Sequence, residues 1–144
     1  MTSPETRPRT ERWVLAFGYG LVAEIATIAT IVVVVMFSKY VFLREWSEAS
    51  LAPAFARIGA IIGFVGGTLF TFVFAQRLMS KIPTHFIAHG VVVALGAIAL
   101  SIAGSLAGQG TVPASYLAAS ALKIIAGALA GFLYDRSETR KRMV

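Results

Sequence analysis

The sequence contains no cysteine and few charged residues, and both shortages restrict what the protein can be. Without cysteine, the chain forms no disulfide, thiolate metal site, iron–sulfur cluster or cysteine nucleophile. Charged residues are 14% of the 144 positions, against about 25% in soluble domains. A soluble fold of this size has too much surface to cover with so few charges. We therefore exclude a soluble domain, a disulfide scaffold and a disordered chain.

Apolar residues are abundant instead, at 57% of the chain with a mean hydropathy of +0.76, and they gather in four runs. These runs are Trp13–Phe37, Ile58–Ala75, Phe86–Leu106 and Ala114–Tyr134, the second extended at its start to Pro53. A helix needs about 20 residues to cross the hydrocarbon core of a bilayer. The runs show no alternation of period two, which favours helices over the strands of a barrel.

We therefore predict an all-α integral membrane protein, a four-transmembrane-helix bundle with spans at about 13–37, 53–75, 86–106 and 114–134. The first run is too long for the core of a signal peptide and is predicted to be a retained span. Basic tails at 1–12 and 135–144 flank the membrane domain. The connection Ser38–Arg57 mixes aromatic and charged residues and is interpreted as an interfacial segment or an overhang of the first helix.

Lysine and arginine are unevenly divided between the two sides that this topology creates. One side, with both termini, has nine: Arg7, Arg9, Arg12, Arg77, Lys81, Arg136, Arg140, Lys141 and Arg142. The other has three: Lys39, Arg44 and Arg57. The positive-inside rule then predicts that both termini are cytoplasmic. The net charge is +6, but the basic residues flank the apolar runs and form no stripe on one face of a fold. The lipid bilayer is therefore the expected partner, and nucleic acid is not.

Glycines recur every fourth residue in three of the predicted spans. The residues concerned are Gly59, Gly63, Gly67, Gly104, Gly108, Gly127 and Gly131. Such spacing puts small residues on one helix face, where two backbones can approach closely. These faces are predicted to pack either within one bundle or between copies in a homo-oligomer, and the sequence does not choose between the two.

Glu24 and Lys123 are the charged residues that lie inside the four apolar runs when the second run is counted from Ile58. Each lies 11 residues from the cytoplasmic end of its run, at Trp13 and Tyr134 respectively, which is a depth of about 16 Å, near the bilayer midplane. The first and fourth helices are antiparallel in this topology. We therefore predict that Glu24 and Lys123 form an intramembrane salt bridge, because a lone charge at this depth is costly.

Helical spacing adds hydroxyl groups to the predicted pair. Thr27 shares a helix face with Glu24, and Ser120 shares one with Lys123. These four residues are the candidates for handling an ion or a proton. Other hydroxyls that could extend a polar interior are Thr68, Thr71, Ser101 and Ser105.

His85 and His89, four residues apart at the start of the third span, are weak candidates for a metal site. A metal site would need further ligands from other segments, and the nearest candidates on that side are Glu11, Asp135 and Glu138. The favoured interpretation is that His85 lies at the headgroups and that His89 forms a hydrogen bond with a neighbouring carbonyl or hydroxyl. We expect no cofactor. The polar groups near the interface are also too few to predict an enzyme, so catalysis is the less favoured interpretation.

A glutamate within the first of four membrane helices resembles the small multidrug-resistance exporters, a likeness that implies exchange of a substrate for protons. This chain departs from their pattern in its greater length and in Lys123. Two functions stay open. The first is a structural or accessory membrane protein, for example a subunit of a larger complex, in which the pair fixes helix packing. The alternative is a small oligomeric transporter coupled to ions or protons that uses Glu24 and Lys123.

Overall fold

The computed structural model describes residues 9–41, 47–109, 111 and 114–142, and all its regular structure is helical. The helices in chain order are α1 (Arg9–Val41), α2 (Glu48–Ile61), the π-helical turn η2 (Ile62–Gly66), α3 (Gly67–Met79), α4 (Phe86–Gln109) and α5 (Ser115–Arg142). The predicted tail over 1–12 lies mostly outside the described residues. The tail predicted over 135–144 is helical as far as Arg142, because it continues α5.

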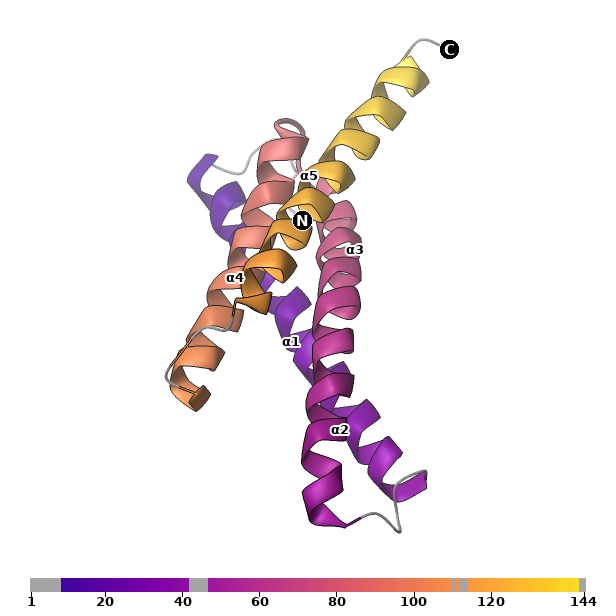
Figure 1. Cartoon of the computed structure of the whole chain (residues 1–144). Coiled ribbons are helices and arrows are strands. Elements are labelled where there is room, and N and C mark those ends of the chain that lie inside the picture. Colours follow the sequence, from indigo (N-terminus) through magenta and orange to yellow (C-terminus); the bar gives the residue numbers. More distant parts are fainter. Residues whose placement is uncertain (1–8, 42–46, 110, 112–113, 143–144) are drawn as a thin grey trace.

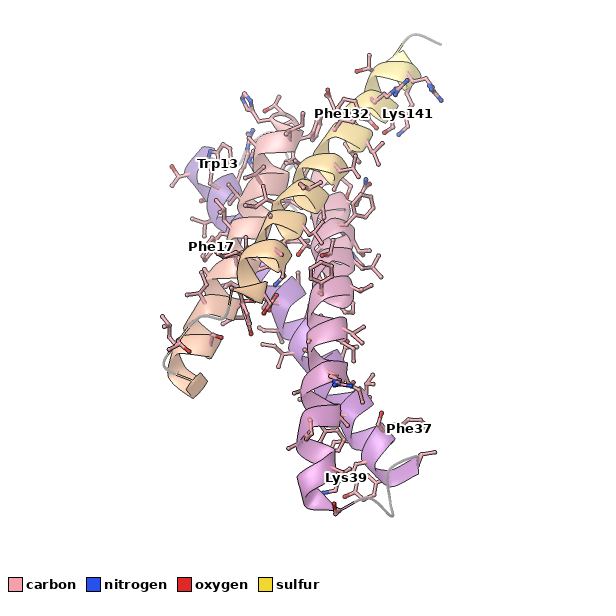
Figure 2. The ribbon with its side chains drawn as sticks, viewed as in Figure 1. Trp13, Phe17, Phe37, Lys39, Phe132 and Lys141 are labelled. Carbon is pink, nitrogen blue, oxygen red and sulfur yellow. The ribbon has the colours of Figure 1, made fainter. Side chains whose placement is uncertain are left out.

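Four helical segments are long and apolar enough to cross a membrane, as predicted: Thr10–Val41, Ser50–Met79, Phe86–Gly108 and Ser115–Lys141. The second of these combines α2, η2 and α3. Large apolar side chains such as Val33 and Ile125 are more than half exposed, which suits helices surrounded by lipid. Trp13 and Lys141 lie toward one end of the molecule, and Phe37 and Lys39 lie toward the other (Figure 2).

The stretch 38–57 begins with the overhang of the first helix that was one of its two interpretations, and the connection that follows is shorter than predicted. Helix α1 continues to Val41 and α2 begins at Glu48, so most of that stretch is helical. Aromatic and charged residues typical of a membrane interface do not themselves end a helix, and near the bilayer a helix satisfies the backbone hydrogen bonds. Pro53 lies inside α2 rather than at its start.

The helices pack tightly at one end of the bundle, where α1 begins, α3 ends, α4 begins and α5 ends (Figure 1). We call this the packed end. Its apolar core consists of Ala16, Ala75, Leu78, Met79, Ile82, Val93 and Ala130. All of these except Ile82 are fully buried, and Leu78, Met79 and Val93 are the largest of the fully buried side chains. Helix α4 lies between α1 and α5 and contacts both along this end.

The opposite end, where α1 ends, α2 begins, α4 ends and α5 begins, is the open end. Helix α2 packs mainly against α1 and η2. In Figure 1 the lower parts of α4 and α5 diverge from α2 and from the end of α1. The bundle therefore has a closed half and a splayed half, and the site described below lies where the two meet.

The second span contains a π-helical turn that the hydropathy pattern did not predict. Residues Ile62–Gly66 adopt this wider turn between α2 and α3. Gly63 and Gly66 lie within it, and Gly59 and Gly67 lie on either side. Glycine weakens the preference for a regular α-helix. Such turns in an α-helix are frequently found beside functional sites.

Candidate functional site

The predicted salt bridge between Glu24 and Lys123 is present. Lys123 Nζ of α5 donates to Glu24 Oε2 of α1 at 2.5 Å. The side chains are 5% and 8% exposed for Lys123 and Glu24 respectively. Helices α1 and α5 run antiparallel and bring residues at equal depth together. The equal spacing of Glu24 from Trp13 and of Lys123 from Tyr134 therefore predicted this contact correctly.

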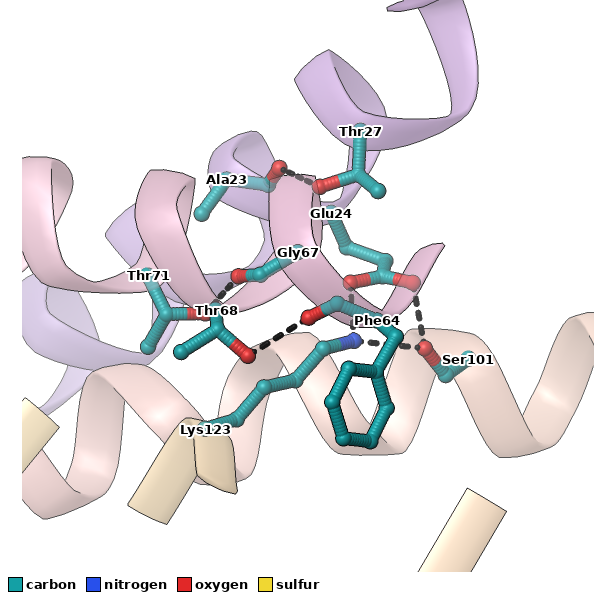
Figure 3. A network of polar contacts seen from close by, with 9 residues as sticks. All are labelled: Ala23, Glu24, Thr27, Phe64, Gly67, Thr68, Thr71, Ser101 and Lys123. Carbon is teal, nitrogen blue, oxygen red and sulfur yellow. Dashed lines mark hydrogen bonds and ion pairs between the residues drawn. The ribbon is translucent and has the colours of Figure 1, made fainter. Parts of the chain in front are cut away.

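Ser101 of α4 completes a triad with these two residues. Its hydroxyl donates to Glu24 Oε1 and accepts a hydrogen bond from Lys123 Nζ at 3.0 Å. Figure 3 shows the three side chains meeting from three different helices. The sequence placed Ser101 among several hydroxyls of a polar interior without distinguishing it. Each charge is thus paired and hydrogen bonded, as burial of charge requires.

Gly67, the first residue of α3, lies directly against the aliphatic part of Lys123. A Cβ atom at this position would approach Lys123 Cε to 2.9 Å and Thr27 Cγ2 to 3.6 Å. The missing side chain therefore leaves the space through which the lysine reaches Glu24. Helix α3 takes part in the site by this close approach, and not by a charged or polar side chain.

A cavity of about 590 Å³ adjoins the triad on the side of the open end. All three triad residues contribute to its wall. The remaining lining residues come from α1, α2, η2, α4 and α5: Thr27, Ile28, Ile31, Ala56, Gly59, Ala60, Gly63, Phe64, Leu100, Gly104, Ser105, Gly108, Ser115, Tyr116, Ala119 and Ser120. The wall is mostly apolar with several hydroxyls, and Glu24 and Lys123 are its charged members.

The hydroxyls of the spans differ in how they are satisfied. Four threonines donate to the carbonyl four residues earlier in their own helix, at 2.7–2.9 Å: Thr27, Thr30, Thr68 and Thr71. This internal bond is the usual solution for a helical hydroxyl in an apolar environment. Ser105 is 6% exposed, yet its hydroxyl has no hydrogen-bond partner among the described residues. It lines the cavity one turn from Ser101.

The other two candidates for ion or proton handling, Thr27 and Ser120, also line the cavity. The Thr27 hydroxyl donates to the carbonyl of Ala23 and not to the ion pair. Ser120 is half-buried and lies one turn before Lys123 on the cavity wall. The predicted faces of α1 and α5 are therefore those that the structure turns toward the cavity.

The seven glycines named from their spacing fall into different environments. A Cβ on Gly131 would approach the carbonyl oxygen of Phe86 to 2.5 Å, and one on Gly127 would overlap the carbonyl oxygen of Gly90. Among the described residues, Ile31 is the one that lies within 4 Å of a Cβ position at Gly59 or Gly63, at 3.7 and 4.0 Å respectively.

Gly104 and Gly108 face open space, because no atom of the described residues lies within 4 Å of the position that a Cβ atom would occupy there. Three other glycines make close helix contacts that the spacing rule missed. Gly20 and Gly96 join α1 to α4, and Gly90 joins α4 to α5. Gly90 and Gly96 are six residues apart and serve different helices, so a four-residue repeat does not detect them.

The two histidines do not share one helix face. Helix α4 begins at Phe86, and His85 precedes it with a φ of 58°. His89 Nδ1 lies 2.9 Å from the carbonyl oxygen of His85, and its ring stacks on Trp13 with centroids 4.0 Å apart. Among the described residues, no cluster of three histidine, aspartate or glutamate side chains could hold a metal ion.

Comparisons with protein-family models, with curated proteins and with solved structures found no match for this chain. The function is therefore argued from the triad and its cavity.

Proposed function

We propose that the chain is a small membrane transporter whose substrate binds in the cavity at the Glu24–Ser101–Lys123 triad. The observation that supports this proposal is that a cavity of about 590 Å³ reaches both intramembrane charges. Ionisable residues within membrane spans are costly, and they commonly mark the path of a substrate, an ion or a proton. The proposal includes insertion in the bilayer with both termini cytoplasmic, so that the cavity faces the opposite side.

The triad can exist in two electrostatic states. In the first, Lys123 and Glu24 neutralise each other, and Ser101 bonds to both. A ligand group that takes the place of either partner, or a proton on Glu24, breaks the pair and frees the other charge for a new contact. Such an exchange couples the occupancy of the cavity to the packing of α1 against α5.

Transport also requires a second arrangement in which the packed end opens. In the structure that end is closed by the fully buried side chains of Leu78, Met79 and Val93. The π-helical turn η2 lies at the junction of the two halves and supplies a place where the second span can bend. Alternating access would then be a movement of helices about the triad.

A second candidate function is architectural, with the protein acting as a structural or accessory subunit. The nearly complete burial of both side chains supports this alternative, because a pair that only fixes helix register is best sealed from water. In that case the cavity would be filled by lipid, by a second copy or by a partner helix.

The absence of cysteine allows a direct test of water access. A single cysteine at Ser120→Cys would be reactive toward a membrane-impermeant maleimide if the cavity is wet, because only a hydrated thiol ionises and reacts. The matched control is Ile125→Cys, which lies at a similar depth but is 60% exposed on the outer surface of the bundle. We expect labelling at position 120, from the non-cytoplasmic side, and none at position 125.

Thr71→Cys tests whether the packed end ever opens. Thr71 is fully buried on the far side of Gly67 from the cavity. A transporter should allow slow modification of this thiol from the cytoplasmic side. An inert thiol at both 71 and 120 would favour the architectural function instead, and labelling of position 120 from the cytoplasm would reverse the proposed orientation.

A further inference from the structure

We infer that the substrate of this cavity is zwitterionic, carrying a cationic and an anionic group close together beside an apolar substituent. This inference rests on the proposed function and names the chemical class of its substrate. It derives from three features of the site: an ion pair in the cavity wall, a buried hydroxyl without a partner among the described residues one turn away, and apolar residues over much of the wall.

A ligand with a single charge can pair with one member of the ion pair only, and it leaves the other protein charge without a counterion. A cation bound to Glu24 would leave Lys123 with Ser101 as its remaining polar contact, and an anion bound to Lys123 would leave Glu24 in the same position. A stranded charge in a low-dielectric site is strongly unfavourable. A zwitterion supplies both opposite charges at once, so that each protein charge keeps a partner and the site stays neutral.

Ser105 is a source of a further polar contact at the same wall once its buried hydroxyl turns toward the cavity. Its hydroxyl is buried and has no partner within the described part of the chain, although it lies one turn from Ser101 on α4. Most buried hydroxyls in proteins are hydrogen bonded. The ligand's anionic group would accept hydrogen bonds from Lys123 Nζ and from the Ser105 hydroxyl, while its cationic group would donate to Glu24.

The rest of the cavity determines what else the ligand carries. Ile28, Ile31, Phe64 and Leu100 form apolar parts of the wall, and the volume of about 590 Å³ is within the range of small-molecule sites. An aliphatic substituent would bury its surface there. Two sources present this chemistry, a free amino acid with an apolar side chain and the headgroup region of a zwitterionic phospholipid.

Matched probes separate the charge requirement from size and hydrophobicity. The full-length protein, purified in a maltoside detergent, would be titrated with L-leucine, with L-leucinamide, which keeps the cation alone, and with 4-methylpentanoate, which keeps the anion alone. Phosphatidylethanolamine and phosphatidylglycerol in mixed micelles form the lipid arm. Saturable binding raises the thermal unfolding temperature, because the ligand binds the folded state only.

We expect saturable stabilisation by a zwitterion and at least tenfold weaker binding of its singly charged analogues. Stabilisation by leucine identifies a free amino acid, and stabilisation by phosphatidylethanolamine alone identifies a lipid headgroup. The inference is overturned if leucinamide or 4-methylpentanoate binds as well as leucine, if phosphatidylglycerol matches phosphatidylethanolamine, or if neither zwitterion binds.

Ser105→Ala tests the geometry of the site with little risk to folding. Loss of an unpartnered buried hydroxyl should leave the unfolding temperature of the free protein unchanged or slightly raised. We expect it to weaken zwitterion binding about tenfold, the effect of losing one hydrogen bond to a charged group. Ser80→Ala removes an exposed hydroxyl outside the cavity and should bind as the unmodified protein does. Equal binding by the Ser105 and Ser80 variants would remove Ser105 from the site.

Failure of the inference can be told apart from failure of the proposed function. Counterflow of the bound zwitterion in proteoliposomes tests transport. Binding without counterflow would contradict the transporter function and leave the zwitterion site intact. Counterflow of a singly charged solute, with no zwitterion bound, would support the transporter and overturn the zwitterion.

Discussion

The packed end and the open end of the bundle are built from similar sequence but differ in how closely their helices approach. At the packed end, Gly90 and Gly127 face each other, and a Cβ on either would overlap the other's carbonyl oxygen. At the open end, Gly104 and Gly108 have no described atom within 4 Å of such a Cβ position. Four-residue glycine spacing therefore occurs both in a helix contact and in the wall of a cavity.

The difference teaches that the ion pair lies at a boundary. On the side of the packed end, the helix backbones are in close contact, and this contact fixes the positions of Glu24 and Lys123. On the other is a space that a ligand or water can enter. Neither half alone would make a site, because a binding site needs rigid support together with access.

Removing one member of the ion pair should have the largest effect on the packed framework. Glu24→Leu or Lys123→Leu leaves an uncompensated buried charge, and we expect a loss of about 3–5 kcal/mol in the free energy of unfolding. The double apolar variant should recover much of that loss. Detergent unfolding of the four proteins gives the coupling energy. Additive losses would mean that the two residues stabilise the fold through separate partners.

The fate of function in the double variant then distinguishes the two proposed roles. If the Glu24→Leu/Lys123→Leu protein is stable and keeps its cellular function, the pair is architectural. A stable but inactive double variant would assign the handling of charge to Glu24 and Lys123.

Glycine substitutions compare the two ends directly. Gly90→Ala forces a methyl group into the backbone of α5, so the helices must separate, at an expected cost of about 1–3 kcal/mol. The matched control Gly104→Ala meets open space and should be neutral or stabilising, since alanine favours the helix. Thermal unfolding in detergent measures both. Equal destabilisation at positions 90 and 104 would contradict the described difference between the ends.

Gly67→Ala should have an intermediate effect, because the atom it meets is the flexible Lys123 Cε at 2.9 Å and not backbone. The lysine must adopt a less favourable conformation, at a cost of about 0.5–1.5 kcal/mol. The sharper readout is cavity access. The displaced lysine should alter the labelling rate of Ser120→Cys, whereas Gly18→Ala, which lies outside the cavity and meets no described atom within 4 Å, should not. An unchanged rate in the Gly67 variant would show that the lysine adjusts without disturbing the site.

The smallest effect is expected at the exposed ion pair of α5. Lys141 Nζ lies 2.7 Å from Glu138 Oε1, but the lysine side chain is 72% exposed. Water and salt screen such a pair, so Glu138→Gln should leave the unfolding temperature within experimental error. A loss comparable to that of Glu24→Leu would mean that the far end of α5 contributes to the fold through contacts beyond this pair.

The sequence alone predicted the features that depend on hydropathy and depth. Helix number follows from four apolar runs, and the Glu24–Lys123 contact follows because each charge had one available partner at its depth. Membrane insertion and the cytoplasmic location of the termini stay predictions, for which the nine-to-three charge asymmetry is the basis.

Other features depend on helix crossing and could not be read from spacing. Ser101 was equivalent in sequence terms to Ser105 and Thr71, since any of them could bond to its own helix or to the pair. Only the way α4 crosses α1 and α5 selects Ser101. The cavity likewise arises from the divergence of α2 from α4 and α5, and no local pattern encodes that divergence.

The π-helical turn Ile62–Gly66 also shifts the phase of the second span. Gly59, Gly63 and Gly67 would form one stripe on a regular helix, but the wider turn places an extra residue in the repeat. Gly59 and Gly63 meet Ile31 of α1, and Gly67 meets Lys123 of α5 together with Thr27 of α1. The second span thus stays beside α1 along the whole repeat and gains α5 as a second neighbour after the π-helical turn.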